Sequence, residues 1–195
     1  YLHYMAKRVF IIHGWGGNPE EGWFPWLKEE LINHGFEVYI PSMPDTNNPT
    51  IKNWVGNLKN IIKSPDKNTY FVGHSIGCQT ILRYLENLND NIKVGKVILV
   101  APWFRLKMYE SKEEVRIAKP WIEKKIDFAR VLLHTKDIIS IFSTDDYFVP
   151  LEDSKILKKE LDSKIIIEKN KGHFSGSDKI NKLPSVLNEL INISQ

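Results

Sequence analysis

Short runs of β-branched residues alternate with helical apolar patterns along almost the whole chain. Six runs predict strands, at residues 8–12, 36–40, 69–72, 96–100, 138–142 and 164–168. Five patterns predict helices, at residues 23–34, 54–62, 80–88, 156–161 and 183–191. Strands and helices that alternate in this way predict a doubly wound α/β fold with a mostly parallel sheet.

The length of 195 residues fits one domain, which we place at residues 5–195. Residues 1–4 precede Met5, which would be a natural start, so we expect them to be an upstream extension. The segment 103–119 has no clear place in the alternation. It is either a short excursion over the edge of the site or a helix and its connection.

The sequence also indicates in which cellular compartment the protein is expected. No apolar run approaches the roughly 20 residues that a membrane-spanning helix needs. The N-terminus lacks the basic and apolar segments of a secretory signal. The one cysteine, Cys78, cannot form an intramolecular disulfide, so nothing indicates an oxidising compartment. We therefore expect a cytoplasmic protein without a membrane span.

The charge pattern argues against several classes of partner. The 27 basic and 24 acidic residues give a formal net charge of +3, spread along the chain. A nucleic-acid-binding protein would be expected to carry a concentrated basic stripe. Histidines and the cysteine are scattered without the spacing of metal ligands. We predict no nucleic-acid partner, no metal and no cofactor; the sequence leaves the oligomeric state open.

The residues Gly73-His-Ser-Ile-Gly77 stand where the third strand passes into the third helix. This is the pattern of a nucleophile elbow, in which a serine projects from a sharp turn. Strand and helix nearly collide there, and Gly73 and Gly77 supply the room. The helix N-terminus offers the Ile76 amide and a positive dipole end to a developing oxyanion. The pattern predicts Ser75 as a nucleophile.

A serine nucleophile needs a general base, and the base needs an orienting acid. Asp145 and Asp146 follow the fifth strand and His173 follows the sixth, the chain order that accompanies such an elbow. All three lie beyond strand ends, where open α/β sheets bind ligands. Spacing favours Asp146 only mildly, and either aspartate could cap its loop instead. His74 is predicted to bond locally, since it cannot fold back onto its own turn.

The loop after the first strand, His13-Gly-Trp-Gly-Gly-Asn18, is rich in glycine. The Trp15 amide is the predicted second oxyanion donor, beside that of Ile76. A phosphate-binding loop is the alternative, but the Walker lysine and the full G-x-G-x-x-G spacing are missing. Trp15 reaches Ser75 only if the first and third strands are neighbours, which predicts the sheet order 2-1-3-4-5-6.

Separated motifs extend from about Val9 to the last helix. They are Gly22-Trp-Phe-Pro-Trp26, Leu27-Lys-Glu-Glu-Leu31, Met43-Pro-Asp45, Gly73-His-Ser-Ile-Gly77, Ser143-Thr-Asp-Asp146 and Gly172-His-Phe174. Together they resemble the small serine hydrolases of the YdeN and retinoblastoma-binding-protein-nine type, a minimal branch of the α/β hydrolases. The resemblance implies a fold without a large lid and a triad of Ser75, Asp146 and His173.

Two departures from that family limit what the resemblance implies. The Leu-x-Cys-x-Glu motif for the retinoblastoma pocket is missing, so no binding role through it is expected. The segment between residues 103 and 138 is longer, which leaves the shape of the pocket open.

These features predict a carboxylesterase-like serine hydrolase that cleaves small carboxylic esters or amides through an acyl-enzyme. The alternatives are an acyltransferase, which would use the same residues, and a non-catalytic interaction module on the same scaffold. Six side chains are candidates for an apolar pocket around the nucleophile: His13, Trp15, Met43, Trp103, Phe104 and Phe174.

Overall fold

The computed structural model describes residues 6–192 and contains one six-stranded sheet in which all strands run parallel. The strands are β1 (Arg8–Ile12), β2 (Glu37–Tyr39), β3 (Thr69–His74), β4 (Val97–Val100), β5 (Ile138–Ser143) and β6 (Lys164–Glu168). Their order in the sheet is β2-β1-β3-β4-β5-β6, so the predicted fold class and strand order are confirmed. Residues 1–4, the expected upstream extension, lie outside the described residues.

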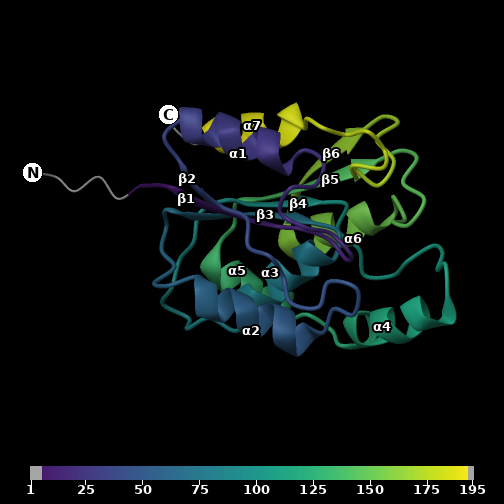
Figure 1. Cartoon of the computed structure of the whole chain (residues 1–195). Coiled ribbons are helices and arrows are strands. Elements are labelled where there is room, and N and C mark those ends of the chain that lie inside the picture. The colour runs from purple at the N-terminus through teal and green to yellow at the C-terminus, as the bar shows by residue number, and fades with distance from the viewer. Residues whose placement is uncertain (1–5, 193–195) are drawn as a thin grey trace, which may run out of the picture.

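Seven helices within residues 6–192 cover both faces of the sheet. They are α1 (Phe24–Asn33), α2 (Ile51–Ile61), α3 (Ile76–Glu86), α4 (Lys112–Glu123), α5 (Phe128–His134), α6 (Asp153–Leu161) and α7 (Pro184–Ile191). Helices α1 and α7 lie on one face, and α2, α3 and α5 lie on the other (Figure 1). The inner strands β3, β4 and β5 are therefore buried along their whole length. No helix of this part of the chain is long and apolar enough to cross a membrane.

The element boundaries follow local chemistry. The structure places β1 and β6 at the predicted residues. Helix α2 begins three residues earlier than predicted, because the Thr50 side chain caps it by accepting a hydrogen bond from the Asn53 amide at 3.2 Å. Helix α3 likewise begins earlier, directly after Ser75, since the turn itself starts the helix.

The segment between β4 and β5 contains helices α4 and α5, which the sequence did not predict as such. Helix α4 is mostly polar: only Ile117, Ala118 and Trp121 are buried, and Pro120 lies inside it. Such a short stripe, interrupted by a proline, gives little helical periodicity to detect. Both alternatives for residues 103–119 thus hold in part, since a loop comes first and a helix capped by Ser111 follows.

Candidate active site

The strained turn at Ser75 is built by its neighbours. Ser75 has a φ of +55° and stands immediately before α3. A Cβ at Gly73 would lie 2.8 Å from the Cys78 nitrogen, and one at Gly77 would collide with the Ile12 carbonyl oxygen. Only glycine fits at these two positions, because strand β1, strand β3 and helix α3 meet there. The Ser75 side chain is consequently held at the carboxyl edge of the sheet.

His173 links Ser75 to Asp146. The His173 Nε2 atom lies 3.0 Å from Ser75 Oγ, and its Nδ1 atom lies 2.9 Å from Asp146 Oδ2. Asp146 is buried, and its Oδ1 accepts hydrogen bonds from the Phe148 and Val149 amides, each at 2.9 Å. These two hydrogen bonds fix the orientation of the carboxylate that contacts the imidazole. The structure thus brings together the three side chains that the sequence singles out.

Asp145 has a different position from its neighbour. It is exposed, and its Oδ1 accepts hydrogen bonds from the Ser143 hydroxyl at 2.7 Å and from the Gly172 amide at 2.9 Å. The first of these bonds, followed by the second, lowers the pKa of Asp145. Asp145 therefore ties the loop after β5 to the loop after β6, while Asp146 contacts the histidine.

Buried aromatic rings hold the main chain at His173. The His173 carbonyl lies 2.7 Å from His74 Nε2, and the Phe174 carbonyl accepts a hydrogen bond from the Trp23 indole at 3.0 Å. On the other side, the His173 amide donates to Asp178 Oδ2 at 2.9 Å. Local bonding was predicted for His74, whereas no contact with His173 or its neighbours was predicted for Trp23 or Asp178. No sequence signal identifies these contacts, because the partners lie on distant segments.

His74 is kept neutral by its surroundings. Burial and then the neighbouring charge of His173 lower the pKa of His74 to about 3. The carbonyl oxygen of His173 can only accept, so the neutral ring donates from Nε2. In the unfolded chain the same side chain has an ordinary pKa near 6.5. Between pH 6.5 and about pH 3 the unfolded chain therefore binds a proton that the folded chain does not, and the free energy of unfolding decreases as the pH falls.

We expect this difference to make the fold acid-sensitive. The free energy of unfolding should fall as the pH drops from 6 to 4, with about 2 kcal/mol of the loss due to His74. The His74→Gln variant keeps an N–H donor for the His173 carbonyl but has no proton to gain. Urea titrations of both proteins at each pH measure the difference. Equal losses in the two proteins would contradict the assignment.

Of the two amides that were predicted to bind the oxyanion, one lies in a loop and the other at the start of a helix. The Trp15 amide belongs to the loop after β1, and the Ile76 amide is the first of helix α3. Within residues 6–192, the structure records no acceptor for either N–H group. Gly14 packs directly on Ser75, since a Cβ at Gly14 would lie 3.3 Å from the Ser75 Cβ. The first loop is thereby held against the nucleophile turn.

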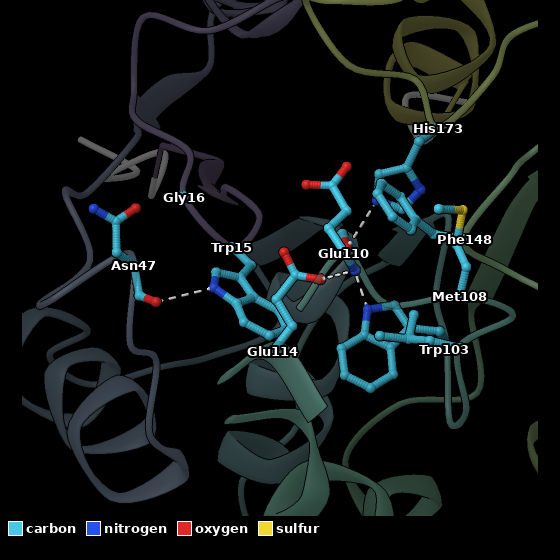
Figure 2. Close-up of a pocket in the computed structure, with 11 residues that line it drawn as sticks. Trp15, Gly16, Asn47, Trp103, Met108, Glu110, Glu114, Phe148 and His173 are labelled. Carbon is cyan, nitrogen blue, oxygen red and sulfur yellow. Dashed lines mark hydrogen bonds between the residues drawn. The ribbon is translucent and has the colours of Figure 1, made fainter. Parts of the chain in front are cut away.

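A cavity of about 310 Å³ opens beside Ser75 and His173 (Figure 2). Its other lining residues are Trp15, Gly16, Asn47, Trp103, Leu106, Met108, Glu110, Glu114 and Phe148. Of the six residues predicted for the pocket, Trp15 and Trp103 line it. A second cavity of about 190 Å³ also reaches Ser75 and shares Trp15, Phe148 and His173 with the first. A substrate held at Ser75 would therefore have space in two adjoining cavities.

The other four predicted pocket residues do not line either cavity. His13 and Met43 are buried and bonded to each other, with the Met43 amide 3.1 Å from His13 Nε2. Phe174 is fully buried in the core. Phe104 turns toward Phe128 of helix α5, with the ring centroids 5.6 Å apart. These predictions were wrong because the loop backbone, which the sequence pattern does not reveal, directs the side chains inward.

Trp103 contacts the nucleophile itself. Its indole N–H donates to Ser75 Oγ at 3.2 Å. Its carbonyl accepts a hydrogen bond from the buried Gln79 amide at 2.9 Å, and Gln79 in turn accepts one from Arg83 at 3.0 Å. An indole only donates, so the serine oxygen accepts from Trp103 while its own proton remains available to His173. This contact was not foreseen, although Trp103 was expected near the site.

Known proteins share this sequence and this fold. The sequence model of the serine hydrolase family matches residues 9–192. YdeN of Bacillus subtilis (strain 168) is 32% identical over 186 residues, which are 95% of each protein. Serine hydrolase RBBP9 of Rattus norvegicus is 26% identical over 174 residues, which cover 88% of this chain and 89% of the relative.

The crystal structure of B. subtilis YdeN matches with a TM-score of 0.87 and 31% identity, over 96% of this chain and 98% of that one. The resemblance inferred from the separated motifs is thus confirmed. The chain belongs to the serine hydrolase family.

Proposed function

We propose that this protein cleaves small carboxylic esters or amides through an acyl-enzyme formed on Ser75. The observation that carries the proposal is the continuous series of hydrogen bonds from Ser75 Oγ through His173 to Asp146, at 3.0 and 2.9 Å. Because the Asp146 carboxylate accepts, the Nδ1 atom of His173 carries a proton and Nε2 is free to take one. The serine is thus paired with a base in the correct tautomer.

In the proposed reaction, Ser75 Oγ attacks the carbonyl carbon while its proton passes to His173 Nε2. The Trp15 and Ile76 amides bind the oxygen that becomes negative, aided by the positive end of helix α3. His173 then protonates the leaving alcohol or amine. Water, activated by the same nitrogen, releases the acid and restores Ser75. Asp146 stabilises the imidazolium in both steps.

Covalent labelling tests this proposal without knowledge of the substrate. A fluorophosphonate probe should add once per chain, and peptide mapping should place the adduct on Ser75. The reason is that only a serine with an adjacent base is nucleophilic near neutral pH. The other serines of the protein are the internal control. A folded sample that takes up no probe, or takes it up stoichiometrically elsewhere, would exclude the proposed reaction.

Short acyl groups should be the better substrates. The cavity is at the small end of the usual range for ligand sites, and the carboxylates of Glu110 and Glu114 line it. A longer apolar chain would have to displace water from these carboxylates. Across p-nitrophenyl esters below their micelle concentrations, kcat/KM should be highest between acetate and hexanoate and fall beyond. A maximum at dodecanoate or longer would contradict the expected size limit.

A further inference from the structure

Both cavities at Ser75 contain acidic side chains but no lysine or arginine. Glu110 and Glu114 line the larger one, and Glu21 lines the smaller one. The chain as a whole has more basic than acidic residues, 27 against 24. Each of three other surface pockets of residues 6–192 is lined by at least one lysine. The negative charge is therefore a local property of the space around the nucleophile.

Two basic side chains near this cavity, those of Lys107 and Arg116, bond elsewhere. Leu106 and Met108 line the larger cavity, whereas Lys107 between them donates its ammonium to the Asp146 carbonyl at 2.6 Å. Arg116 of helix α4 pairs with Glu113, its Nε lying 2.9 Å from the carboxylate. Among the described residues, no ion pair involves Glu110 or Glu114. Their charges remain available to a ligand.

The two carboxylates share the cavity with aromatic rings. In Figure 2, Glu114 lies between Trp15 and Trp103, and the Glu110 side chain lies above them on the side of His173. The Glu110 amide donates to Glu114 Oε2 at 2.6 Å, which holds that carboxylate in place. Aromatic faces attract cations, tryptophan most strongly. Trp103 is only 1% exposed, whereas Trp15 is half-buried, so Trp15 is the tryptophan that a cation can reach. A cavity that combines aromatic rings with two carboxylates suits a ligand that has both an apolar part and a positive charge.

We propose that the substrates of this enzyme carry a positively charged amine or quaternary ammonium group, bound in the cavity of Trp15, Trp103, Glu110 and Glu114. The inference rests on the proposed acyl-enzyme reaction at Ser75 and specifies which esters or amides it takes. The two carboxylates and the Trp15 ring should give a cationic ester about a tenfold advantage in kcat/KM over an uncharged ester of the same shape.

Isosteric pairs of esters measure this advantage directly. In the first pair the acyl group varies: p-nitrophenyl 4-(trimethylammonio)butyrate is compared with p-nitrophenyl 5,5-dimethylhexanoate. In the second pair the alcohol varies: butyrylcholine is compared with 3,3-dimethylbutyl butyrate. Each pair replaces a charged nitrogen by a carbon of the same shape, so size effects cancel. We expect the cationic member to be preferred about tenfold in at least one pair, and less so at high salt.

The double variant Glu110→Gln, Glu114→Gln removes both charges and nearly preserves shape. Its preference ratio should fall close to one. Glu123→Gln is the control for loss of a carboxylate from helix α4, because Glu123 lies at the opposite end of that helix from Glu114 and pairs with Lys119 at the surface. This control changes the net charge by one unit and should keep the ratio of the wild type. Since each ratio is taken on one protein sample, a partial loss of folded enzyme cancels.

The outcomes separate the two proposals. If the probe does not label Ser75 of the wild type, the acyl-enzyme reaction itself fails. If Ser75 is labelled and neutral esters are cleaved, a ratio at or below one in both pairs overturns the cationic substrate class alone. A preference that survives in the double variant overturns the assignment to Glu110 and Glu114. A preference lost only in the double variant supports the proposal.

Discussion

Replacing Ser75 by alanine is expected to lower kcat for a short p-nitrophenyl ester by about 10⁶-fold. Within residues 6–192, the Ser75 hydroxyl is the only hydrogen-bond partner recorded for His173 Nε2, at 3.0 Å, so no other side chain replaces it. The Trp15 and Ile76 amides would remain, and a residual rate about 10³-fold above the uncatalysed reaction is expected from them. Assays stopped after long incubation at high enzyme concentration measure this residual rate.

Cys78 provides the control for that experiment. It lies three residues after Ser75, in the first turn of helix α3, and is fully buried. Burial raises the pKa of its thiol, so a reactive thiolate is disfavoured. The Cys78→Ala variant should keep kcat within about threefold of the wild type. A loss comparable to that of Ser75→Ala would point to the wrong nucleophile.

The nucleophile turn could be predicted because its information is local. Ser75 supplies the reactive hydroxyl. Gly73 and Gly77, each two residues away, leave the space in which β1, β3 and α3 meet. Asp146 and His173 are far from it in sequence, but each directly follows a strand. Once the strand order is predicted, parallel topology brings their loops to the same edge of the sheet. The predicted sheet topology was therefore enough to place Asp146 and His173 near Ser75.

The walls of the cavity could not be predicted in the same way. Beyond a strand end, the direction of each side chain depends on the backbone of an irregular loop. Met43 and Phe174 point into the core, while Phe148, which was not singled out, lines both cavities. One usable signal was overlooked. The order Leu106, Lys107, Met108 alternates apolar and charged residues, which is typical of an extended segment with one apolar face.

The hydrogen bonds to the main-chain carbonyls at His173 and Phe174 could not be predicted from the sequence, for another reason. His74 bonds to a carbonyl 99 residues away, and Trp23 to one 151 residues away. Backbone carbonyls carry no sequence identity, so no residue pattern marks them as partners. Burial in the fold also makes His74 a neutral donor, since desolvation is the main cause of its lowered pKa. Such roles follow from packing and not from motif.

Asp146→Asn is expected to lower kcat by about 10⁴-fold while the protein stays folded. Oδ1 of Asp146 accepts two backbone hydrogen bonds, from the Phe148 and Val149 amides. An asparagine would keep these bonds through its own oxygen and so place its NH₂ group where Oδ2 now meets His173 Nδ1 at 2.9 Å. That NH₂ donates, so the imidazole must carry its proton on Nε2 and cannot accept the serine proton.

Asp145→Asn is the matched comparison, because it makes the same chemical change one residue earlier. Both hydrogen bonds to Asp145 enter Oδ1, from Ser143 and Gly172, and an asparagine oxygen accepts both. We expect kcat to fall less than about tenfold, since the imidazole tautomer is untouched. Thermal unfolding of both variants verifies that each is folded at the assay temperature. If Asp145→Asn proves the more damaging change, Asp146 is not the residue that orients His173.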